Sequence, residues 1–485
     1  MFKKTPLIFE KDKNTDKYLD VPKSDVPELK LSDYLPSKMI RKALPEIPSL
    51  AEPEVVRHFS NLADKNHHVD KDFYPLGSCT MKYNPKINDK IASFPSFLDA
   101  HPDQNPSTFQ GHLELLYNLE KMLNSITGMH STTLQPSAGS QGEFVGLLIM
   151  QKYHQTKQNN KDTILIPETA HGTNPASVIL AGYKVVQIKT DQDGCIDIDD
   201  LKLKTDNNVA GMMLTQPNTL GVFESRIQEI KKIISSVDGL LYMDGANLNA
   251  LLNICRPGDL GFDIVHMNLH KTFSTPHGGG GPGSGPIGVV EKLRPYLPSP
   301  IIVKEKKCYS LVYSEDSIGK IHSFYGNVGV LIRAYCYIKS IGNIGLKEIS
   351  MNAIVNANYL KAKLKNHYNV PFSEGTMHEF VISAVNQKNK GLKALDIAKL
   401  IIDKGYHAPT IYFPINVPEA IMIEPTETES KKTLDDFIEL MIYIDENIDK
   451  KLDEFLKAPV KTPVSRLNET KANRELDLAW KKNEL

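Results

Sequence analysis

The chain has 485 residues, 41% of them hydrophobic, and its formal net charge at pH 7 is −1. A chain of this length exceeds one minimal core, so a large domain and at least one smaller domain are expected. The near-zero charge argues against binding to nucleic acid or to an anionic membrane, and no apolar stretch approaches the roughly 20 residues that span a bilayer.

The first 20 residues lack the features of a targeting segment. Their two early lysines are soon followed by acidic residues, without the apolar core of a signal peptide or the acid-poor character of a transit peptide. A cytoplasmic protein is therefore expected. The cysteines are odd in number, widely spaced and without a CxxC pair, which argues against a disulfide framework or a metal site; they are Cys79, Cys195, Cys255, Cys308 and Cys336.

Residues 1–65 are expected to form an extended N-terminal arm with short helices, because prolines recur there without a long hydrophobic period. Residues 66–330 are expected to form a large α/β domain. Amphipathic patterns predict helices over residues 112–128 and 139–155. Short apolar runs then alternate with helical patterns, which indicates a mainly parallel, seven-stranded type of sheet with helices on both faces. The expected strands cover residues 163–168, 184–190, 209–217, 239–246, 263–271 and 287–293.

Residues 331–460 are expected to form a smaller C-terminal α+β domain. Helical patterns cover residues 326–365, 394–405 and 430–456, and short apolar strands cover residues 379–384 and 420–425. Residues 461–485 form a polar tail with the only tryptophan, Trp480, which is expected to dock on the body or on a partner.

Several polar residues lie at or just beyond the carboxyl ends of the predicted strands. They are His171, Thr215, Asp244 and Lys271. Because ligands of open α/β sheets bind beyond the carboxyl ends of the strands, these side chains are expected to meet at one site.

Asp244 and Lys271 suggest a specific chemistry. A lysine amine can form a Schiff base with pyridoxal phosphate, and a carboxylate can keep the pyridine nitrogen protonated. A lone lysine after a strand is usually a solvated cation, and an Asp before Gly245 can simply cap a turn. Their combination with a glycine-rich turn and His171 favours the catalytic interpretation.

The remaining parts of a cofactor site can also be assigned. His171 is expected to lie flat on the pyridine ring; the alternative is a histidine at a helix start that Thr173 and Asn174 cap. Ala138, Gly139 and Ser140 open an apolar helix whose free N–H groups suit a phosphate. The glycine-rich segment 278–286 is not a Walker loop, because no Gly-Lys-Ser/Thr follows; a close approach to the cofactor and a plain linker remain alternatives.

Four segments carry a resemblance to a known family. They are FYPLGSCTMKYNP (residues 73–85), PETAHGTNPAS (167–177), MDGANLNA (243–250) and MNLHKTFSTPHGGGGPG (267–283). They resemble the glycine-cleavage P-protein family, the decarboxylating glycine dehydrogenases, and most closely subunit 2 of the two-subunit bacterial form. The similarity extends over nearly the whole chain.

The resemblance implies a fold-type I pyridoxal-phosphate enzyme. Lys271 would form the Schiff base, Asp244 would contact the ring nitrogen and His171 would stack on the ring. Ala246 and His270 are expected near the cofactor as well. The resemblance further implies a companion subunit 1, with two copies of each subunit in the assembly.

The implied reaction is decarboxylation of glycine with transfer of the aminomethyl group to the lipoyl arm of H-protein. The sequence agrees in one respect: residues 334–465 contain no arginine. A bidentate arginine would stabilise the substrate carboxylate that must leave, although Arg256, Arg294 and Arg333 remain available.

Two alternatives remain open from the sequence. One is another fold-type I enzyme, an amino-acid decarboxylase or an aminotransferase; the other is a non-catalytic subunit of such an enzyme. His171, His270 and His277 are equivalent candidates for proton transfer, because histidine titrates nearest neutrality. The sequence does not distinguish a chemical role of Cys79 from simple packing.

Overall fold

The computed structural model describes residues 5–11, 25–42, 48–276 and 282–479. The chain forms two compact units, Asp72–Lys457 and the combination of Met1–Lys71 with Ala458–Leu485. The helices of this terminal unit are short except for α2, which begins after Ala51, whose N–H donates to Glu54 at 3.1 Å. The elements are α1 (Ile8–Lys11), η1 (Leu31–Asp33), η2 (Ser37–Met39), α2 (Glu52–Ala63) and α16 (Glu469–Arg474).

The larger unit, Asp72–Lys457, is built on a seven-stranded sheet in the order β1-β7-β6-β5-β4-β2-β3. Five neighbouring strands, β6 to β3 in this order, are parallel, whereas β7 is antiparallel to both β6 and β1. The strands are β1 (Ser131–Thr133), β2 (Thr163–Pro167), β3 (Lys184–Ile188), β4 (Val209–Thr215), β5 (Leu240–Gly245), β6 (Ile264–Met267) and β7 (Ile287–Val289).

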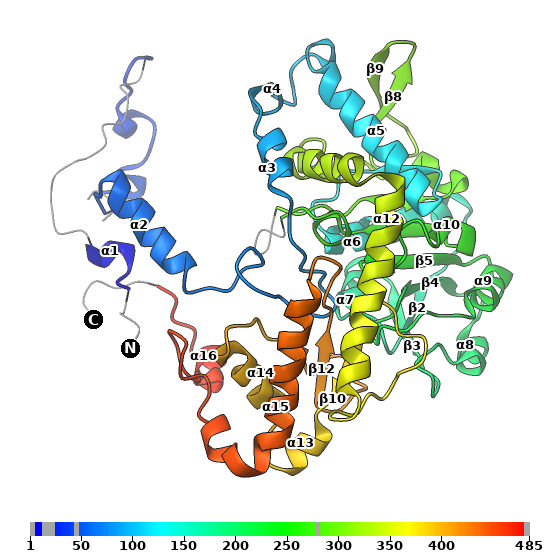
Figure 1. Ribbon diagram of the computed structural model, residues 1–485. Coiled ribbons are helices and arrows are strands. Elements are labelled where there is room, and N and C mark those ends of the chain that lie inside the picture. The colour runs from blue at the N-terminus through cyan, green and yellow to red at the C-terminus, as the bar shows by residue number, and fades with distance from the viewer. Residues whose placement is uncertain (1–4, 12–24, 43–47, 277–281, 480–485) are drawn as a thin grey trace. The chain divides into compact units, whose positions relative to one another are not determined.

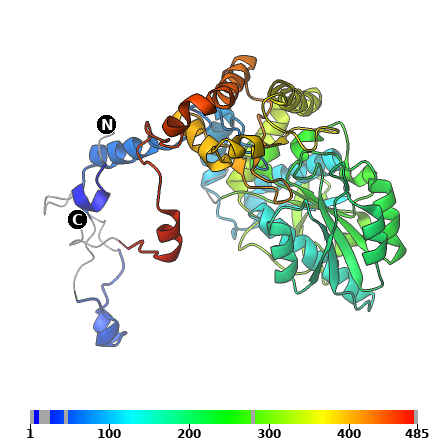
Figure 2. The ribbon, with the colours of Figure 1, turned by 90° about the horizontal axis from the view of Figure 1, so that it is seen from below.

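Helices cover both faces of this sheet (Figure 2). Side chains along a strand point alternately to opposite faces. On β4, Met212 and Leu214 pack in one hydrophobic cluster with α5 (Gln110–Thr127), α9 (Ile227–Ser236) and α12 (Val328–Leu364). Met213 packs in a second cluster with α6 (Gly139–Thr156) and α7 (Thr173–Leu180). The central strands are therefore buried on both faces, as their nearly continuous apolar sequences predict.

Local sequence signals account for the ends of these helices. Gly128, at φ 71°, ends α5 in the left-handed conformation, and the Asp197 side chain caps α8 by accepting from Asp199 and Asp200. The helices of this part are α3 (Lys86–Ala92), α4 (Pro95–Leu98), η3 (Pro106–Thr108), α5 (Gln110–Thr127), α6 (Gly139–Thr156), α7 (Thr173–Leu180), α8 (Ile198–Lys204), α9 (Ile227–Ser236), η4 (Leu248–Ala250), α10 (Pro257–Leu260), α11 (Leu269–Thr272) and η5 (Glu291–Tyr296).

A smaller antiparallel sheet, in the order β10-β12-β11, follows in the C-terminal half of this unit. The long helix α12 leads to it and changes direction at Gly342, whose φ of 68° interrupts the helical backbone (Figure 1). Ser430 caps α15 by accepting from the N–H of Thr433. These elements are α12 (Val328–Leu364), β10 (Phe380–Ser383), α13 (Val385–Asn389), α14 (Ala394–Asp403), β11 (Thr410–Ile411), β12 (Ala420–Ile423) and α15 (Lys431–Phe455).

The structure differs from the sequence prediction in several places, among them strand β1 of the large sheet, which was not predicted. The hairpin of β8 (Ile301–Glu305) and β9 (Cys308–Val312) was not predicted, because the lysine-rich turn interrupts its apolar pattern. Helix α8 was also not predicted. Lys271 lies on the short helix α11 and not directly on the strand before it. The predictions for residues 277–281 and Trp480 fall outside the described residues.

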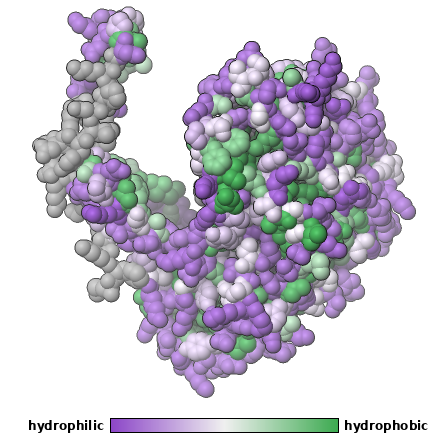
Figure 3. Space-filling view, turned by 45° about the horizontal axis from the view of Figure 1, so that its top comes forward, coloured by the Kyte–Doolittle hydropathy of each residue, from purple (hydrophilic) through white to green (hydrophobic). Residues whose placement is uncertain are grey.

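The face shown in Figure 3 is mostly hydrophilic, with hydrophobic residues gathered in separate patches. None of the described helices combines the length and the apolar character needed to cross a membrane.

Candidate functional site

Three polar side chains lie next to one another at the carboxyl ends of β4, β5 and β6. In the parallel register, Thr215 pairs with Asp244 and Asp244 pairs with His266. All three residues are buried. The sheet thus brings together two of the residues predicted from the sequence and adds His266, which was not predicted.

Asp244 is an ionised carboxylate with a full set of partners. His266 Nε2 lies 3.1 Å from its Oδ1, the Ala246 N–H donates to the same oxygen at 2.9 Å, and Asn174 Nδ2 donates to Oδ2 at 3.0 Å. Burial alone would raise the pKa of Asp244, but the His266 charge and these hydrogen bonds lower it well below its ordinary value. Ala246, predicted near the cofactor, therefore contributes its backbone N–H to Asp244.

His266 is the second member of a buried ion pair. Burial acts to lower its pKa, but the charge of Asp244 and their hydrogen bond outweigh burial and raise it. Its Nδ1 lies 2.9 Å from the Tyr242 hydroxyl, which fixes the orientation of the ring. Replacing either member would leave the other buried with an unbalanced charge.

Glu143 of α6 links this pair to α7. Its two oxygens accept hydrogen bonds from the hydroxyls of Thr173 and Ser177, each at 2.8 Å. Burial and the neighbouring charge of Asp244 raise the pKa of Glu143, whereas His266 and the two hydroxyls act in the opposite direction. These contacts fix the start of α7, next to His171.

Lys271 is buried, and its Nζ donates to the carbonyl oxygen of Ser78 at 2.7 Å. The contact joins residues 193 positions apart. Ser78 has a φ of 61°, which is uncommon for a residue with a side chain and often marks functional sites. The local backbone therefore presents a carbonyl group to the lysine amine.

His171 lies in the loop between β2 and α7 and is half-buried. Its Nδ1 lies 2.9 Å from the Thr173 hydroxyl, and its ring is edge-on to Phe413 at a centroid distance of 5.7 Å. Burial lowers the pKa of His171, and Lys271 and His266 contribute to the lowering while Asp244 opposes it. The imidazole is therefore neutral at pH 7 and can offer a flat face.

The start of α6 allows close approach of the backbone. Ala138 is the N-cap residue, Gly139 is buried and Ser140 is exposed. A side chain at Gly139 would place its Cβ 2.2 Å from Oδ1 of Asn268, the residue that precedes α11. A larger residue would therefore fit here only if the Asn268 side chain moved.

The structure also describes two further residues predicted from the sequence, Thr215 and His270. The Thr215 hydroxyl is buried and has no hydrogen-bond partner among the described residues. His270 lies on α11 beside Gly283, whose added Cβ would be 3.0 Å from His270 Nδ1. His277 lies outside the described residues. Of the three candidates for proton transfer, His171 and His270 have a described position.

These residues fit pyridoxal phosphate. Asp244 is a carboxylate kept ionised in a buried site, as pairing with a pyridinium requires. The unpartnered Thr215 hydroxyl and the glycine start of α6 offer donors of the kind that a phosphate accepts. Lys271 supplies a buried primary amine.

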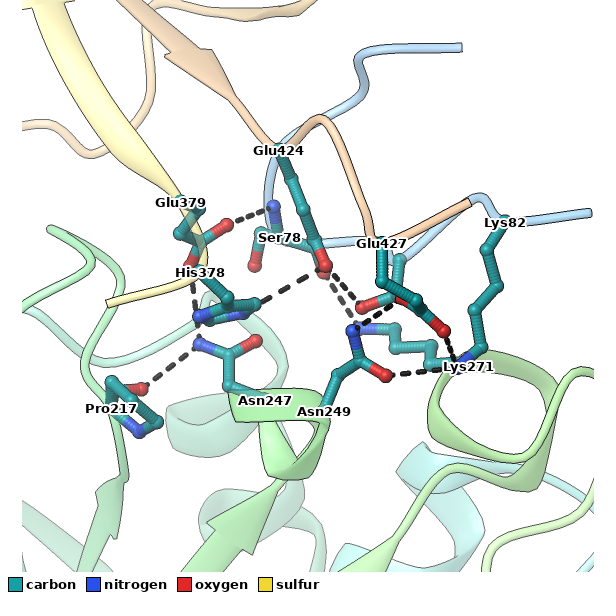
Figure 4. Close-up of polar contacts among 12 residues, drawn as sticks. Ser78, Lys82, Pro217, Asn247, Asn249, Lys271, His378, Glu379, Glu424 and Glu427 are labelled. Atoms are coloured by element: carbon teal, nitrogen blue, oxygen red, sulfur yellow. Dashed lines mark hydrogen bonds and ion pairs between the residues drawn. The ribbon is translucent and has the colours of Figure 1, made fainter. Parts of the chain in front are cut away.

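The smaller sheet contributes a second cluster of buried polar side chains, shown in Figure 4, which was not predicted. His378 and Glu379 precede β10, and Glu424 follows β12; all three are fully buried. In the sequence, these residues stand directly beside apolar strands, as Asp244 does. Such a position alone does not identify a site, because most charged residues beside strands are solvated.

Comparison with known proteins gives the family. The family model of the glycine cleavage system P-protein matches residues 15–316, and that of the glycine dehydrogenase C-terminal domain matches residues 349–462. The chain is 52% identical to a probable glycine dehydrogenase (decarboxylating) subunit 2 of Chloroherpeton thalassium over 98% of this chain and 97% of that protein. A protein of the same name from Staphylococcus epidermidis is also 52% identical, over 98% and 95%.

Solved structures agree on the fold. A crystal structure of glycine decarboxylase (P-protein) of the glycine cleavage system, in inhibitor-bound form, superposes with a TM-score of 0.73 at 17% identity, over 85% of this chain and 94% of that chain. Lactobacillus brevis glutamate decarboxylase gives 0.65 at 12% identity, over 88% and 96%. The predicted fold-type I architecture is confirmed. On the extent and identity of the sequence match, the chain belongs to the glycine cleavage system P-protein family.

Proposed function

We propose that this chain carries the active site for pyridoxal-phosphate-dependent decarboxylation of glycine. One observation supports this most directly: a buried lysine amine and a buried, ionised carboxylate follow adjacent parallel strands in a chain 52% identical to glycine dehydrogenase (decarboxylating) subunit 2 proteins. A subunit that had lost its chemistry would have no reason to retain both groups.

Each residue has a defined task in this proposal. Lys271 attaches the cofactor through its amine. Asp244 keeps the ring nitrogen protonated, and His266 and Asn174 fix the orientation of its carboxylate. When bound, pyridoxal phosphate supplies an electron sink for the electron pair that remains on the substrate carbon as carbon dioxide leaves.

The remaining predicted residues position the cofactor. The neutral His171 ring stacks on the pyridine ring and restricts its tilt. The N–H groups at Ala138, Gly139 and Ser140 bind the phosphate, with the Thr215 hydroxyl as a further donor. Ala246 and His270 border the same space.

The positions of the three arginines that could have bound the substrate carboxylate support decarboxylation. Arg256 pairs with Asp259 at 2.6 Å and Arg333 pairs with Asp89 at 2.6 Å, so both are already engaged. Arg294 lines a separate cavity of about 380 Å³, whose lining includes none of the side chains described above. A carboxylate that must leave gains from a site that does not stabilise it in the ground state.

Partners complete the proposal. The relatives' names describe a subunit 2, and we propose an assembly of two copies of this chain with two copies of a companion subunit 1, in the cytoplasm. The acceptor of the aminomethyl group is the lipoyl arm of H-protein. The division into domains also stays a prediction; its ranges are 1–65, 66–330, 331–460 and 461–485.

Reconstitution tests the function. The exchange of labelled bicarbonate with the glycine carboxyl group is measured with this chain, the companion subunit, cofactor and lipoylated H-protein, and with each component omitted. Exchange should require all four. Turnover of a larger amino acid without H-protein would indicate another decarboxylase or an aminotransferase instead, and full activity without the companion subunit would contradict the proposed assembly.

A further inference from the structure

Two buried carboxyl groups from the smaller sheet lie close together near Lys271. His378 Nε2 is 4.0 Å from Glu379 Oε1 and 3.9 Å from Glu424 Oε1, and all three side chains are fully buried. Figure 4 shows them gathered around Ser78, with the Lys271 side chain extending toward the same place. The function proposed above assigns them no role.

The hydrogen bonds of the two carboxyl groups differ. Both oxygens of Glu379 accept N–H donors, from the Ser78 backbone at 2.6 Å and from Asn247 at 3.2 Å. Glu424 Oε1 accepts from the Thr80 hydroxyl at 2.5 Å, whereas its Oε2 has no hydrogen-bond partner among the described residues. N–H donors stabilise an ionised carboxylate, so the negative charge belongs on Glu379 and the proton on Glu424.

The pKa directions agree with this assignment. Burial raises the pKa of Glu379 to about 7, although the Ser78 N–H, Lys271 and Asn247 act to lower it. Burial and then the charge of Glu379 raise the pKa of Glu424 well above its ordinary value, although Thr80 and Lys271 oppose them. The pair therefore loses one of its two protons near pH 7 and carries a single proton above it.

Other titratable groups around the pair do not supply that proton. Burial lowers the pKa of His378 to about 3, so its ring is neutral. Burial raises the pKa of the Cys79 thiol, which stays protonated at neutral pH. Glu427 is ion-paired with Lys82 at 2.8 Å. The Lys271 amine is the remaining titratable group that acts on both acids.

Ser78 links the acid pair to the lysine. Its N–H donates to Glu379, and its carbonyl oxygen accepts from Lys271 Nζ at 2.7 Å. Two residues later along the same segment, the Thr80 hydroxyl donates to Glu424. A single short stretch of backbone therefore sets the positions of both acids relative to the amine.

We propose that Glu379 and Glu424 together hold one proton and serve as the proton partner of the Lys271 amine when the substrate amine displaces Lys271 from the cofactor. This inference rests on the function proposed above. In the step, the released Lys271 side chain moves from its contact with the Ser78 carbonyl to within hydrogen-bond distance of Glu424. The O–H bond of Glu424 then breaks and an N–H bond forms on the neutral Nζ, which converts an acid and an amine into a carboxylate and an ammonium. The ammonium offsets the repulsion between the two carboxylates. The reverse transfer occurs when Lys271 rejoins the cofactor.

The test uses the assembled enzyme with its cofactor and three isosteric variants. Glu424→Gln keeps a neutral side chain that cannot release this proton, and Glu379→Gln removes the ionised member. Glu429→Gln is the matched control, because Glu429 lies in the same loop and burial also raises its pKa to about 7, yet it contacts neither acid in the described structure. The rate at which glycine displaces Lys271 is followed by the visible absorbance of the lysine–cofactor imine across pH.

Glu424→Gln should retain the imine absorbance but slow the displacement by roughly 10²-fold, the size of a general acid–base contribution. The infrared absorbance of protonated carboxylic acids should lose the component that Glu424 contributes, seen as a difference from the unmodified enzyme. Glu429→Gln should keep the displacement rate and the Glu424 component. If Glu424→Gln does not fold, Thr80→Val provides the second variant: loss of the hydroxyl donor should move the pH profile of displacement to higher pH.

Specific results would overturn the proposed role of Glu379 and Glu424 as the proton partner of Lys271. An unchanged displacement rate and pH profile in Glu424→Gln would do so, as would an unchanged infrared band. A stoichiometric metal ion that is present in the unmodified enzyme and absent from Glu424→Gln would assign the cluster to metal binding instead. Absence of the imine absorbance from the unmodified enzyme would contradict the proposed function itself, which separates the two failures.

Discussion

At the scale of single residues, the site depends on one buried ion pair. Asp244 and His266 occupy paired positions on β5 and β6, so the sheet register fixes their separation. A carboxylate in such a site stays ionised only because His266, Asn174 and the Ala246 N–H stabilise the charge. In the proposed function, these residues would set the electronic state of the cofactor ring through Asp244.

Asp244→Asn tests this arrangement. The substitution preserves shape but removes the charge, so the ring nitrogen loses its partner and His266 loses the interaction that raises its pKa. We expect glycine–bicarbonate exchange to fall by at least roughly 10²-fold, about 3 kcal/mol of transition-state stabilisation. The absorbance of the lysine–cofactor imine should remain. Exchange within threefold of the unmodified enzyme would contradict the role.

His171 offers a test that separates shape from proton transfer. His171→Ala should weaken cofactor retention and slow exchange, because the stacking surface is lost. His171→Phe keeps a flat ring and should restore retention while leaving no proton carrier. Cofactor dissociation, measured by dialysis and absorbance, distinguishes the two, and equal retention in the Ala variant and the unmodified enzyme would remove His171 from the ring-binding surface.

The titration of Glu379 predicts a pH dependence of stability. Its pKa is raised by burial from the ordinary value near 4.3 to about 7, so its contribution is fully present below about pH 4.3 and is lost as pH rises through about 7. The size is on the order of 3 kcal/mol. The Tm of the cofactor-free assembly should therefore fall less between pH 5 and pH 8 in Glu379→Gln. An identical decrease in both proteins would contradict this account.

At the scale of elements, the site forms where helix starts and strand ends meet. Gly139 opens α6 against Asn268, the residue that precedes α11. This approach brings the N–H groups proposed to bind the phosphate close to the start of the helix that carries Lys271. A Cβ at Gly139 would fit only if the Asn268 side chain moved.

Gly139→Ala should therefore lower cofactor affinity and cost about 1–3 kcal/mol of stability through overpacking. Gly111→Ala is the matched control, because a Cβ at Gly111 in the first turn of α5 meets nothing within 4 Å. Cofactor titration and thermal unfolding measure both effects. Equal behaviour of the two variants would show that the close approach has no functional importance.

At the scale of the whole molecule, the sequence predicted the large sheet well and the contacts across the chain poorly. Strands β2, β4, β5 and β6 were recognisable because buried parallel strands are continuous apolar runs. Their carboxyl ends then located Asp244, Thr215 and Lys271 without any knowledge of long-range contacts. The structure agrees with the placement, while the roles of these residues stay predictions.

The acid pair shows what the sequence could not provide. Ser78 and Glu379 are 301 residues apart, and Thr80 and Glu424 are 344 apart. Nothing in local periodicity connects such positions, and a Glu beside a strand is usually solvated. The hairpin β8–β9 was missed for a local reason, since its lysine-rich turn conceals the strand pattern.

The central claim is that Lys271 carries the cofactor. Borohydride reduction of the assembled enzyme followed by peptide mass spectrometry tests it most directly. We predict the mass of the reduced cofactor on the peptide that contains Lys271, and its loss together with the visible absorbance in Lys271→Ala. A labelled peptide from another part of the chain, or undiminished imine absorbance in Lys271→Ala, would contradict the account.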